Sequence, residues 1–239
     1  MGVTPGLQAV AATRPDGPAI TTLVCDYGGV LTNPLAETYA VFSDSTGIPV
    51  EDLQTAFVRA TRRYGVSPMA ELEIGAIAED ELVRRVLSEL DTDPGDVLRG
   101  LPFGEVWFRG RRTNEELTAF LRTVRAAGHR VGLLTNNVRE WEPRWRAALP
   151  VAELFDTVVD SSREGVRKPD PEIYRRLVAR LGADPATVLF LDDLEENCAA
   201  ARAQGMHAIR FDTTDQAVRD VGRLMGLPAL VHEPSGGTS

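Results

Sequence analysis

Residues 20–32 read ITTLVCDYGGVLT. The first six residues are mainly apolar or β-branched, which is typical of a short strand buried in a parallel sheet. Asp26 follows this run directly, and the glycine pair after Tyr27 lets the backbone approach a ligand closely. In open α/β sheets, ligands bind at the carboxyl ends of the strands. The segment therefore predicts a first strand that carries Asp26 to the functional edge of such a sheet.

Short apolar runs alternate with helical patterns along the rest of the chain. Helices are expected at 194–204 and at 171–182, where Asp170-Pro171 begins the pattern. The alternation predicts an α/β fold with a Rossmann-like parallel sheet covered by helices on both faces. Strands are expected at residues 20–25, 131–134, 157–159, 188–191 and 208–211.

The stretch between the first two expected strands is much longer than the roughly 30 residues of a strand–helix–strand unit. It contains helical patterns at residues 38–47, 51–63 and 79–90 and no convincing strand. We therefore expect a helical cap at 35–105, inserted over the carboxyl edge of the sheet. The remaining expected divisions are a core at 19–34 and 106–232 and flexible tails at 1–18 and 233–239.

The charge balance disfavours several classes of partner. The 239 residues include 26 basic and 35 acidic side chains, a net charge of −9. Such a chain repels nucleic acid and anionic membrane surfaces. We expect a small-molecule ligand, a monomer or a homodimer, and neither a membrane span nor a secretory leader. The only cysteines, Cys25 and Cys198, are expected in the core, which favours a reducing cytoplasm.

One count among the basic residues is unusual. Lys168 is the only lysine, and the other 25 basic residues are arginines. A composition with this bias indicates that arginine serves wherever a general positive charge is sufficient. Lys168 is therefore expected at a place that a wide guanidinium group cannot fill.

Polar residues follow or flank the expected strands at four places. They are Asp26, Thr135 with Asn136, Lys168, and Asp192-Asp193. A parallel sheet would gather these groups at one edge. Carboxylate oxygens suit Mg²⁺, a further carboxylate can be a nucleophile, and an ammonium group neutralises phosphoryl oxygens. The three histidines lie in unrelated contexts, so neither a Ser/His/Asp triad nor a zinc site is indicated.

Four segments resemble, in order, the motifs of the haloacid dehalogenase-like (HAD) hydrolases. They are the strand ending at Asp26, LLTNN, RKPDPEIY and FLDDLEENCAAARAQGM. The chain is most similar to subfamily I, with a helical C1 cap. It resembles the branch that contains the phosphatase domain of soluble epoxide hydrolase and the domain fused to some acyl-CoA dehydrogenases. The resemblance implies the same α/β core and a hydrolase.

The resemblance also implies a role for each motif residue. Asp26 would be the nucleophile that forms an aspartyl-phosphate, with Lys168 and Thr135 as its catalytic partners. Asn197 would brace the loop that follows the fourth strand. The phosphoryl group would be bound by Tyr27, Gly28, Thr135, Asn136 and Lys168, and Mg²⁺ by Asp26, the Gly28 carbonyl, Asp193 and, less directly, Asp192.

Gly28 departs from the pattern of the family's phosphatases. Most of them carry a second aspartate at this position, which protonates the leaving oxygen and contributes roughly 10²–10⁴ in rate. The favoured function is still a Mg²⁺-dependent phosphatase acting on a small phosphorylated metabolite. Two alternatives stay open: a 2-haloacid dehalogenase, whose relatives also lack this aspartate, and a pseudoenzyme that binds a phosphate ligand or serves as a scaffold.

The expected cap carries a group of charged residues around 64–70, a turn that should face the cleft. We predict that one of them contacts the leaving group of the substrate, and we place Arg62 in the substrate site. The alternative is a charged face exposed to solvent. Trp107, Trp141 and Trp145 are expected to be packing residues. The group consists of five charged residues and one tyrosine: Arg59, Arg62, Arg63, Tyr64, Glu71 and Glu73.

Overall fold

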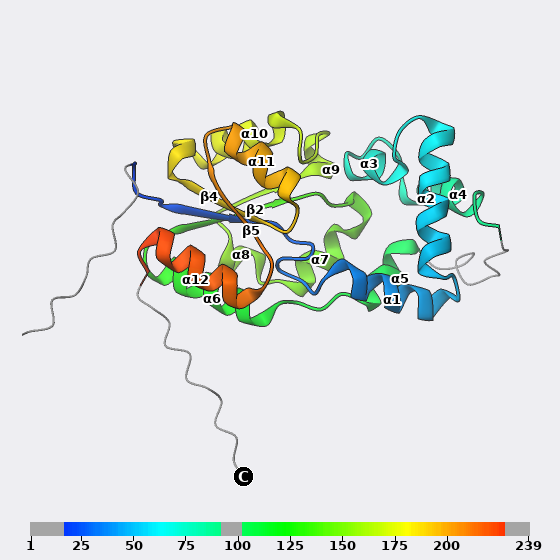
Figure 1. The fold of residues 1–239 in the computed structure, drawn as a ribbon, viewed down its shortest axis with the longest axis horizontal. Coiled ribbons are helices and arrows are strands. Elements are labelled where there is room, and N and C mark those ends of the chain that lie inside the picture. Colours follow the sequence, from blue (N-terminus) through cyan, green and yellow to red (C-terminus); the bar gives the residue numbers. More distant parts are fainter. Residues whose placement is uncertain (1–16, 92–101, 228–239) are drawn as a thin grey trace, which may run out of the picture.

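A computed structural model describes residues 17–91 and 102–227 (Figure 1). Its centre is a five-stranded sheet in the order β3-β2-β1-β4-β5, with every neighbouring pair parallel. The expected α/β fold and its five strands are confirmed, with strand ends shifted by one or two residues. The strands are β1 (Thr22–Cys25), β2 (Arg130–Thr135), β3 (Thr157–Asp160), β4 (Val188–Asp192) and β5 (His207–Arg210).

The central strand β1 is buried on both faces. Leu23 and Cys25 point into one hydrophobic cluster, whereas Val24 points into another on the opposite face of the sheet. This alternation follows from the two-residue period of a strand. In the register, Cys25 lies beside Leu133 of β2 and Leu191 of β4. The residues that follow β1 therefore emerge next to the ends of both neighbouring strands.

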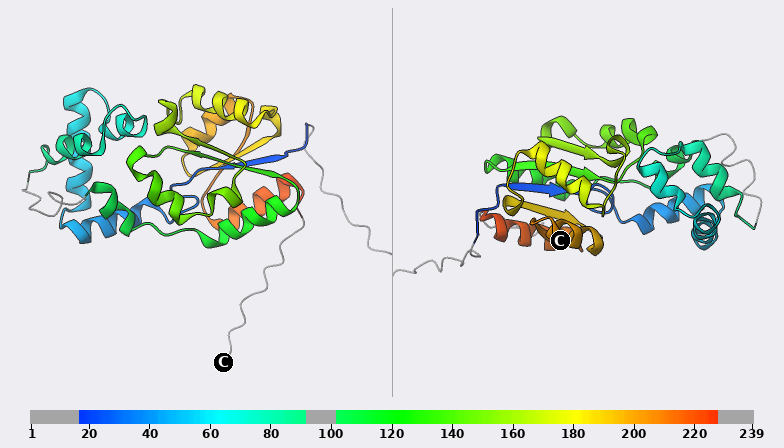
Figure 2. Two further views of the ribbon diagram at one scale, coloured as in Figure 1. Left: turned by 180° about the vertical axis from the view of Figure 1, so that it is seen from behind. Right: turned by 90° about the horizontal axis from the view of Figure 1, so that it is seen from above.

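Helices cover both faces of this sheet (Figure 2). The first cluster is closed by α6 (Glu115–Ala126), α7 (Glu142–Ala148), α8 (Val151–Leu154) and α12 (Thr214–Met225). The second is closed by α10 (Pro171–Leu181) and α11 (Glu195–Ala203). The expected helices at 171–182 and 194–204 are confirmed. Asp170 caps α10 by accepting a hydrogen bond from the Glu172 amide at 2.8 Å.

The inserted helices lie at the right of Figure 1. They pack around a separate hydrophobic cluster. The three expected helices are confirmed, and α3 and α5 appear in addition. Phe42, Leu53, Leu82 and Trp107 belong to this cluster. The cap boundaries at 35 and 105 stay a prediction. The helices are α1 (Leu35–Thr46), α2 (Val50–Tyr64), α3 (Pro68–Glu73), α4 (Glu79–Leu87) and α5 (Phe103–Arg109).

The two segments that connect the inserted helices to the sheet run beside each other. Thr32 forms an antiparallel bridge with Thr113, and the Asn33 amide donates to the Arg112 carbonyl at 2.9 Å. The outgoing chain after β1 is thus paired with the chain that returns after α5. This pairing brings the return segment close to the loop that follows Asp26.

Other expectations from the sequence have mixed outcomes. Cys25 and Cys198 are buried free thiols, as expected. Apart from residues 17 and 18, the expected tails lie outside the described residues. Within 17–91 and 102–227, no helix combines the length and the apolar character needed to cross a membrane. The smaller remaining elements are α9 (Ser161–Glu164), η1 (Arg139–Trp141) and η2 (Pro185–Thr187).

Candidate active site

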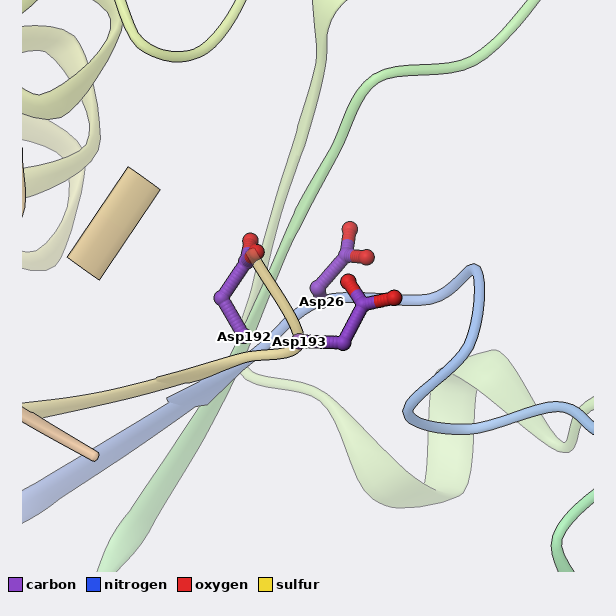
Figure 3. A group of neighbouring side chains, drawn as sticks. All are labelled: Asp26, Asp192 and Asp193. Atoms are coloured by element: carbon purple, nitrogen blue, oxygen red, sulfur yellow. The ribbon is translucent and has the colours of Figure 1, made fainter. Parts of the chain in front are cut away.

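Three carboxylates meet at the carboxyl edge of the sheet (Figure 3). Asp26 follows β1, Asp192 ends β4, and Asp193 begins the next loop. One oxygen from each lies within 4.8 Å of the others. The Asp26 amide donates to the Leu191 carbonyl at 2.9 Å, so the pairing of β1 with β4 continues up to the carboxylates. The register of two adjacent strands therefore places the acidic cluster.

Lys168 lies between two of these carboxylates. Its Nζ donates to Asp26 Oδ1 and to Asp192 Oδ2, both at 2.6 Å, and the residue is only 1% exposed. Asn136 fixes the backbone of the lysine, because its Oδ1 accepts from the Lys168 amide at 2.8 Å and its Nδ2 donates to the Lys168 carbonyl at 3.0 Å. The single lysine thus occupies a narrow, buried position between two anions.

The electrostatics of the cluster are unbalanced. Burial raises the pKa of Asp26 to about 7; Lys168 opposes this change, and Asp192 and Asp193 add to it. Burial alone would lower the pKa of Lys168, but Asp192 and Asp26 raise it above its ordinary value. One ammonium group faces three carboxylates. A divalent cation at this place would relieve the remaining repulsion.

Asp192 and Asp193 have different surroundings. Asp192 is fully buried, and its Oδ1 accepts from the Leu194 amide and from Asn197 Nδ2, both at 2.9 Å, while Lys168 holds its other oxygen. Asn197 is itself anchored through its backbone carbonyl, which accepts a hydrogen bond from the Tyr174 hydroxyl at 3.0 Å. Asp193 is half-buried, and its carboxylate accepts no hydrogen bond from another side chain within the described part of the chain.

Gly29 makes room for Asp193. It has a φ of +84°, and a Cβ on it would lie 2.5 Å from Asp193 Oδ2. Only glycine satisfies both conditions without strain. Both oxygens of Asp192 already accept hydrogen bonds from the protein. The carboxylate oxygens that remain available to a metal are those of Asp193 and the second oxygen of Asp26. Hard oxygen donors of this kind fit Mg²⁺.

A cavity of about 180 Å³ opens beside the carboxylates. Its inner end carries charged and polar groups, and its wall is aromatic. Trp107 and Trp141 stack at a centroid distance of 6.3 Å and line this wall. They also belong to the hydrophobic cluster of the inserted helices, as the packing role favoured by the sequence implies. The lining residues are Asp26, Tyr27, Gly28, Leu35, Tyr39, Met69, Glu73, Trp107, Phe108, Arg111, Asn136, Asn137, Trp141, Arg167, Lys168, Asp193, Leu194 and Asn197.

The sequence matches a known protein family. The family model described as haloacid dehalogenase-like hydrolase matches residues 20–205. The chain belongs to the haloacid dehalogenase-like hydrolases. The family expected from the four motifs is therefore confirmed.

Individual relatives differ in how much of their length this HAD chain covers. Phosphatase MT3486 from Mycobacterium tuberculosis (strain CDC 1551 / Oshkosh) is 30% identical over 227 residues, 86% of this chain and 95% of the relative. Bifunctional epoxide hydrolase 2 from Sus scrofa is 35% identical over 112 residues, 45% of this chain but only 20% of that protein. A HAD-like family hydrolase of known structure from Porphyromonas gingivalis has a TM-score of 0.66 at 23% identity, covering 87% of this chain and 98% of its own.

The structure brings most of the expected site residues of this HAD chain together. Thr135 is fully buried at the end of β2 and is not among the residues that line the cavity. Its expected role in catalysis and phosphate binding stays a prediction. Asp192 stands behind the cavity, held by Lys168 and Asn197. The residues that line the cavity as expected are Asp26, Tyr27, Gly28, Asn136, Lys168 and Asp193.

The expected charged group of the cap is mostly placed elsewhere. Arg62 is exposed on α2 and does not line the cavity, so the structure gives no support for its assignment to the substrate site. Glu71 pairs with Arg85 at 2.6 Å. Of the six residues only Glu73 lines the cavity, because 68–73 forms α3 where the sequence indicated a turn. The Glu73 carboxylate lies 2.7 Å from Arg167 Nε.

Sequence reasoning missed Arg111 and the wall residues Tyr39, Met69 and Phe108. Arg111 lies on the return segment between α5 and α6, next to the loop that follows Asp26. Its position just after the expected end of the cap was the available signal, since a chain that re-enters the core there must pass the cleft. Nothing in its local sequence separates it from the other 24 arginines.

Proposed function

We propose that this HAD chain is a Mg²⁺-dependent phosphatase that acts on a small phosphorylated metabolite through an aspartyl-phosphate on Asp26. The observation that carries the proposal is the buried group of Asp26, Lys168, Asp192 and Asp193 at one edge of the sheet. It combines a carboxylate nucleophile, a fixed ammonium group and oxygen ligands for a metal. This is the set of groups that phosphoryl transfer requires.

The residues divide the reaction between them. Asp26 attacks phosphorus through one carboxylate oxygen while its other oxygen stays available to the metal, and the bond from phosphorus to the leaving oxygen breaks. Lys168 keeps the nucleophile oriented and neutralises the phosphoryl oxygens, while Thr135 and the Asn136 amide bind the same group. Asp26, Asp193 and the Gly28 carbonyl would hold Mg²⁺, which supplies positive charge opposite the phosphoryl oxygens. Water then hydrolyses the aspartyl-phosphate.

The relatives support a phosphatase. Phosphatase MT3486 matches nearly over its whole length. Dehalogenation is the second candidate, because Gly28 removes the acid that most phosphatases of the family use, and a halide leaves without a proton. Against it, Asp193 is available beside Asp26 as a metal ligand, a feature for which halide displacement has no use. A pseudoenzyme would have no need to retain the nucleophile, the lysine and the acidic loop together.

A panel of phosphorylated metabolites, assayed for phosphate release with Mg²⁺, tests the proposal. Wild-type protein should release phosphate from at least one compound, and the Asp26→Asn variant or added EDTA should abolish release. Halide release from 2-haloacids that persists in EDTA would instead establish the dehalogenase. If the wild type turns over neither class while inorganic phosphate still raises its melting temperature, the pseudoenzyme is supported.

A further inference from the structure

Gly28 and Arg111 share one space. Gly28 lies two residues after the nucleophile, where a Cβ would be 3.1 Å from Arg111 Nη2. Gly28 is not among the glycines with positive φ, so its backbone would accept a side chain. A terminal nitrogen of the Arg111 guanidinium therefore lies beside the space that a side chain at residue 28 would enter.

Contacts on one side hold this guanidinium in place. Nη1 donates to Thr32 Oγ1 at 2.9 Å, and the group lies 5.8 Å from the centre of the Trp107 ring. Thr32 belongs to the loop after β1, and the Thr32–Thr113 bridge ties the return segment to that loop. Arg111 is therefore positioned by the same loop that carries the nucleophile.

Nε and Nη2 of Arg111 have no hydrogen-bond partner among the residues that the structure describes. Nε is buried, and Arg111 has no ion pair within that part of the chain. Arg111 lines the same cavity as Asp26 and Lys168. A half-buried cation with unused donors at the edge of a ligand cavity is suited to an anionic oxygen.

We propose that Arg111 takes the place of the missing acid at Gly28 by binding the leaving oxygen as an anion, and that the substrate is a phosphate ester or anhydride whose leaving group is a stable anion. This inference rests on the proposed phosphatase function. An arginine stays protonated at neutral pH, so it stabilises an oxyanion without giving up a proton. When Asp26 attacks, the electron pair of the breaking P–O bond stays on the leaving oxygen, which departs paired with Arg111.

This chemistry defines a substrate class. Carboxylic acids ionise at about pH 4 and phenols at about pH 10, whereas alcohols hold their proton far more strongly. A leaving group that is not protonated departs more easily the more acidic its conjugate acid is, so departure should become harder in this order. Acyl phosphates leave most easily, aryl phosphates less easily, and alkyl phosphates hardly at all. The aromatic wall of Tyr39, Trp107, Phe108 and Trp141 favours a leaving group with an apolar body.

The test measures kcat/KM with Mg²⁺ for acetyl phosphate, 4-nitrophenyl phosphate, phenyl phosphate and glycerol phosphate. The variant is Arg111→Met, which keeps an apolar chain against Trp107 and removes the charge. The expected loss grows with the pKa of the leaving group and reaches about 10²- to 10³-fold for phenyl phosphate, as for removal of one oxyanion-binding donor. Arg111→Lys should recover part of this loss. The control is Arg112→Ala, an exposed neighbour paired with Glu37, which should leave all rates unchanged.

Different failures have different meanings. An equal loss for every substrate, or no loss, contradicts the role of Arg111 while leaving the phosphatase in place, provided that turnover still depends on Asp26. Efficient hydrolysis of glycerol phosphate by the wild type contradicts the substrate class. No turnover of acetyl or 4-nitrophenyl phosphate by a wild type that hydrolyses another compound of the metabolite panel contradicts this inference alone, whereas no turnover of any phosphorylated compound contradicts the proposed function. If Arg111→Met does not fold, Arg111→Lys decides, because its loss must also grow with leaving-group pKa.

Discussion

The sheet edge and the aromatic wall form two halves of one cavity, and they are built differently. At the sheet edge, Asp26, Lys168 and Asp192 are joined by hydrogen bonds of 2.6 Å. Asp26 and Asp192 lie at strand ends, and Lys168 lies in the loop between α9 and α10. On the wall, Tyr39 and Met69 come from α1 and α3 and are placed by packing within another hydrophobic cluster. The sheet edge thus carries the charged groups to which we assign the reaction, whereas the inserted helices supply most of the apolar wall against which a substrate would lie.

The largest effect is expected from Lys168→Arg at the sheet edge. A guanidinium is too wide for a position where Nζ lies 2.6 Å from two carboxylates in a residue that is 1% exposed. We expect kcat to fall by about 10²- to 10³-fold, because the charge is displaced from the phosphoryl group. Steady-state kinetics with Mg²⁺ and 4-nitrophenyl phosphate measures this. Arg175→Lys on the surface is the control, and near-normal activity of Lys168→Arg would show that any cation suffices.

Asp192→Asn should separate stability from metal binding. The amide cannot accept from both Lys168 and Asn197, so a buried ion pair is broken at a cost of about 3–5 kcal/mol in the free energy of unfolding. Urea unfolding without metal measures the loss. Asp193→Asn is the matched control: it should unfold within about 0.5 kcal/mol of the wild type but lose the Mg²⁺-dependent rise in melting temperature. Equal destabilisation of both variants would refute the division between the two aspartates.

A smaller effect is expected from Glu79→Ala, which acts on the wall. The buried Glu79 carboxylate accepts from Trp141 Nε1 and from the Gly104 amide, so it connects α4, α5 and the segment after β2. Its removal leaves two buried donors without a partner and should lower the free energy of unfolding by about 1–3 kcal/mol. Thermal unfolding measures this, with the exposed Asp44→Ala in α1 as control. A change no larger than that of the control would mean that the contact contributes nothing.

The smallest effect is expected from Arg62→Ala. Arg62 is exposed on α2 and does not line the cavity, so kcat/KM for the substrates of the panel should stay within the error of the measurement. A clear loss of kcat/KM would restore the interpretation of Arg62 as a substrate-binding residue and would mean that the inserted helices move closer to the sheet during turnover.

The same two halves explain what the sequence predicts. Asp26 was found because an apolar strand followed by a polar residue is a local pattern, and parallel strands gather their ends at one edge. Lys168 was found because it is the only lysine of the chain and lies just before an expected helix. Arg111 and Tyr39 were missed because their places depend on how separate helices pack, which is a matter of long-range contacts. The same reason explains why Glu73 of α3, and not Arg62, lines the cavity, although the sequence placed both near the cleft. The assignment of Arg62 to the substrate site stays a prediction.

The hydrogen bond from the Asp26 amide to the Leu191 carbonyl has a consequence for the dynamics of the protein. It belongs to the central strand pair, which is buried on both faces and flanked by further strands. Amide protons in such a place exchange with solvent only when the whole sheet opens, whereas short helices such as α3 open locally. The hydrogen-exchange rate at Asp26 is therefore expected to report global unfolding, and the backbone of Asp26 keeps its position for as long as the chain is folded.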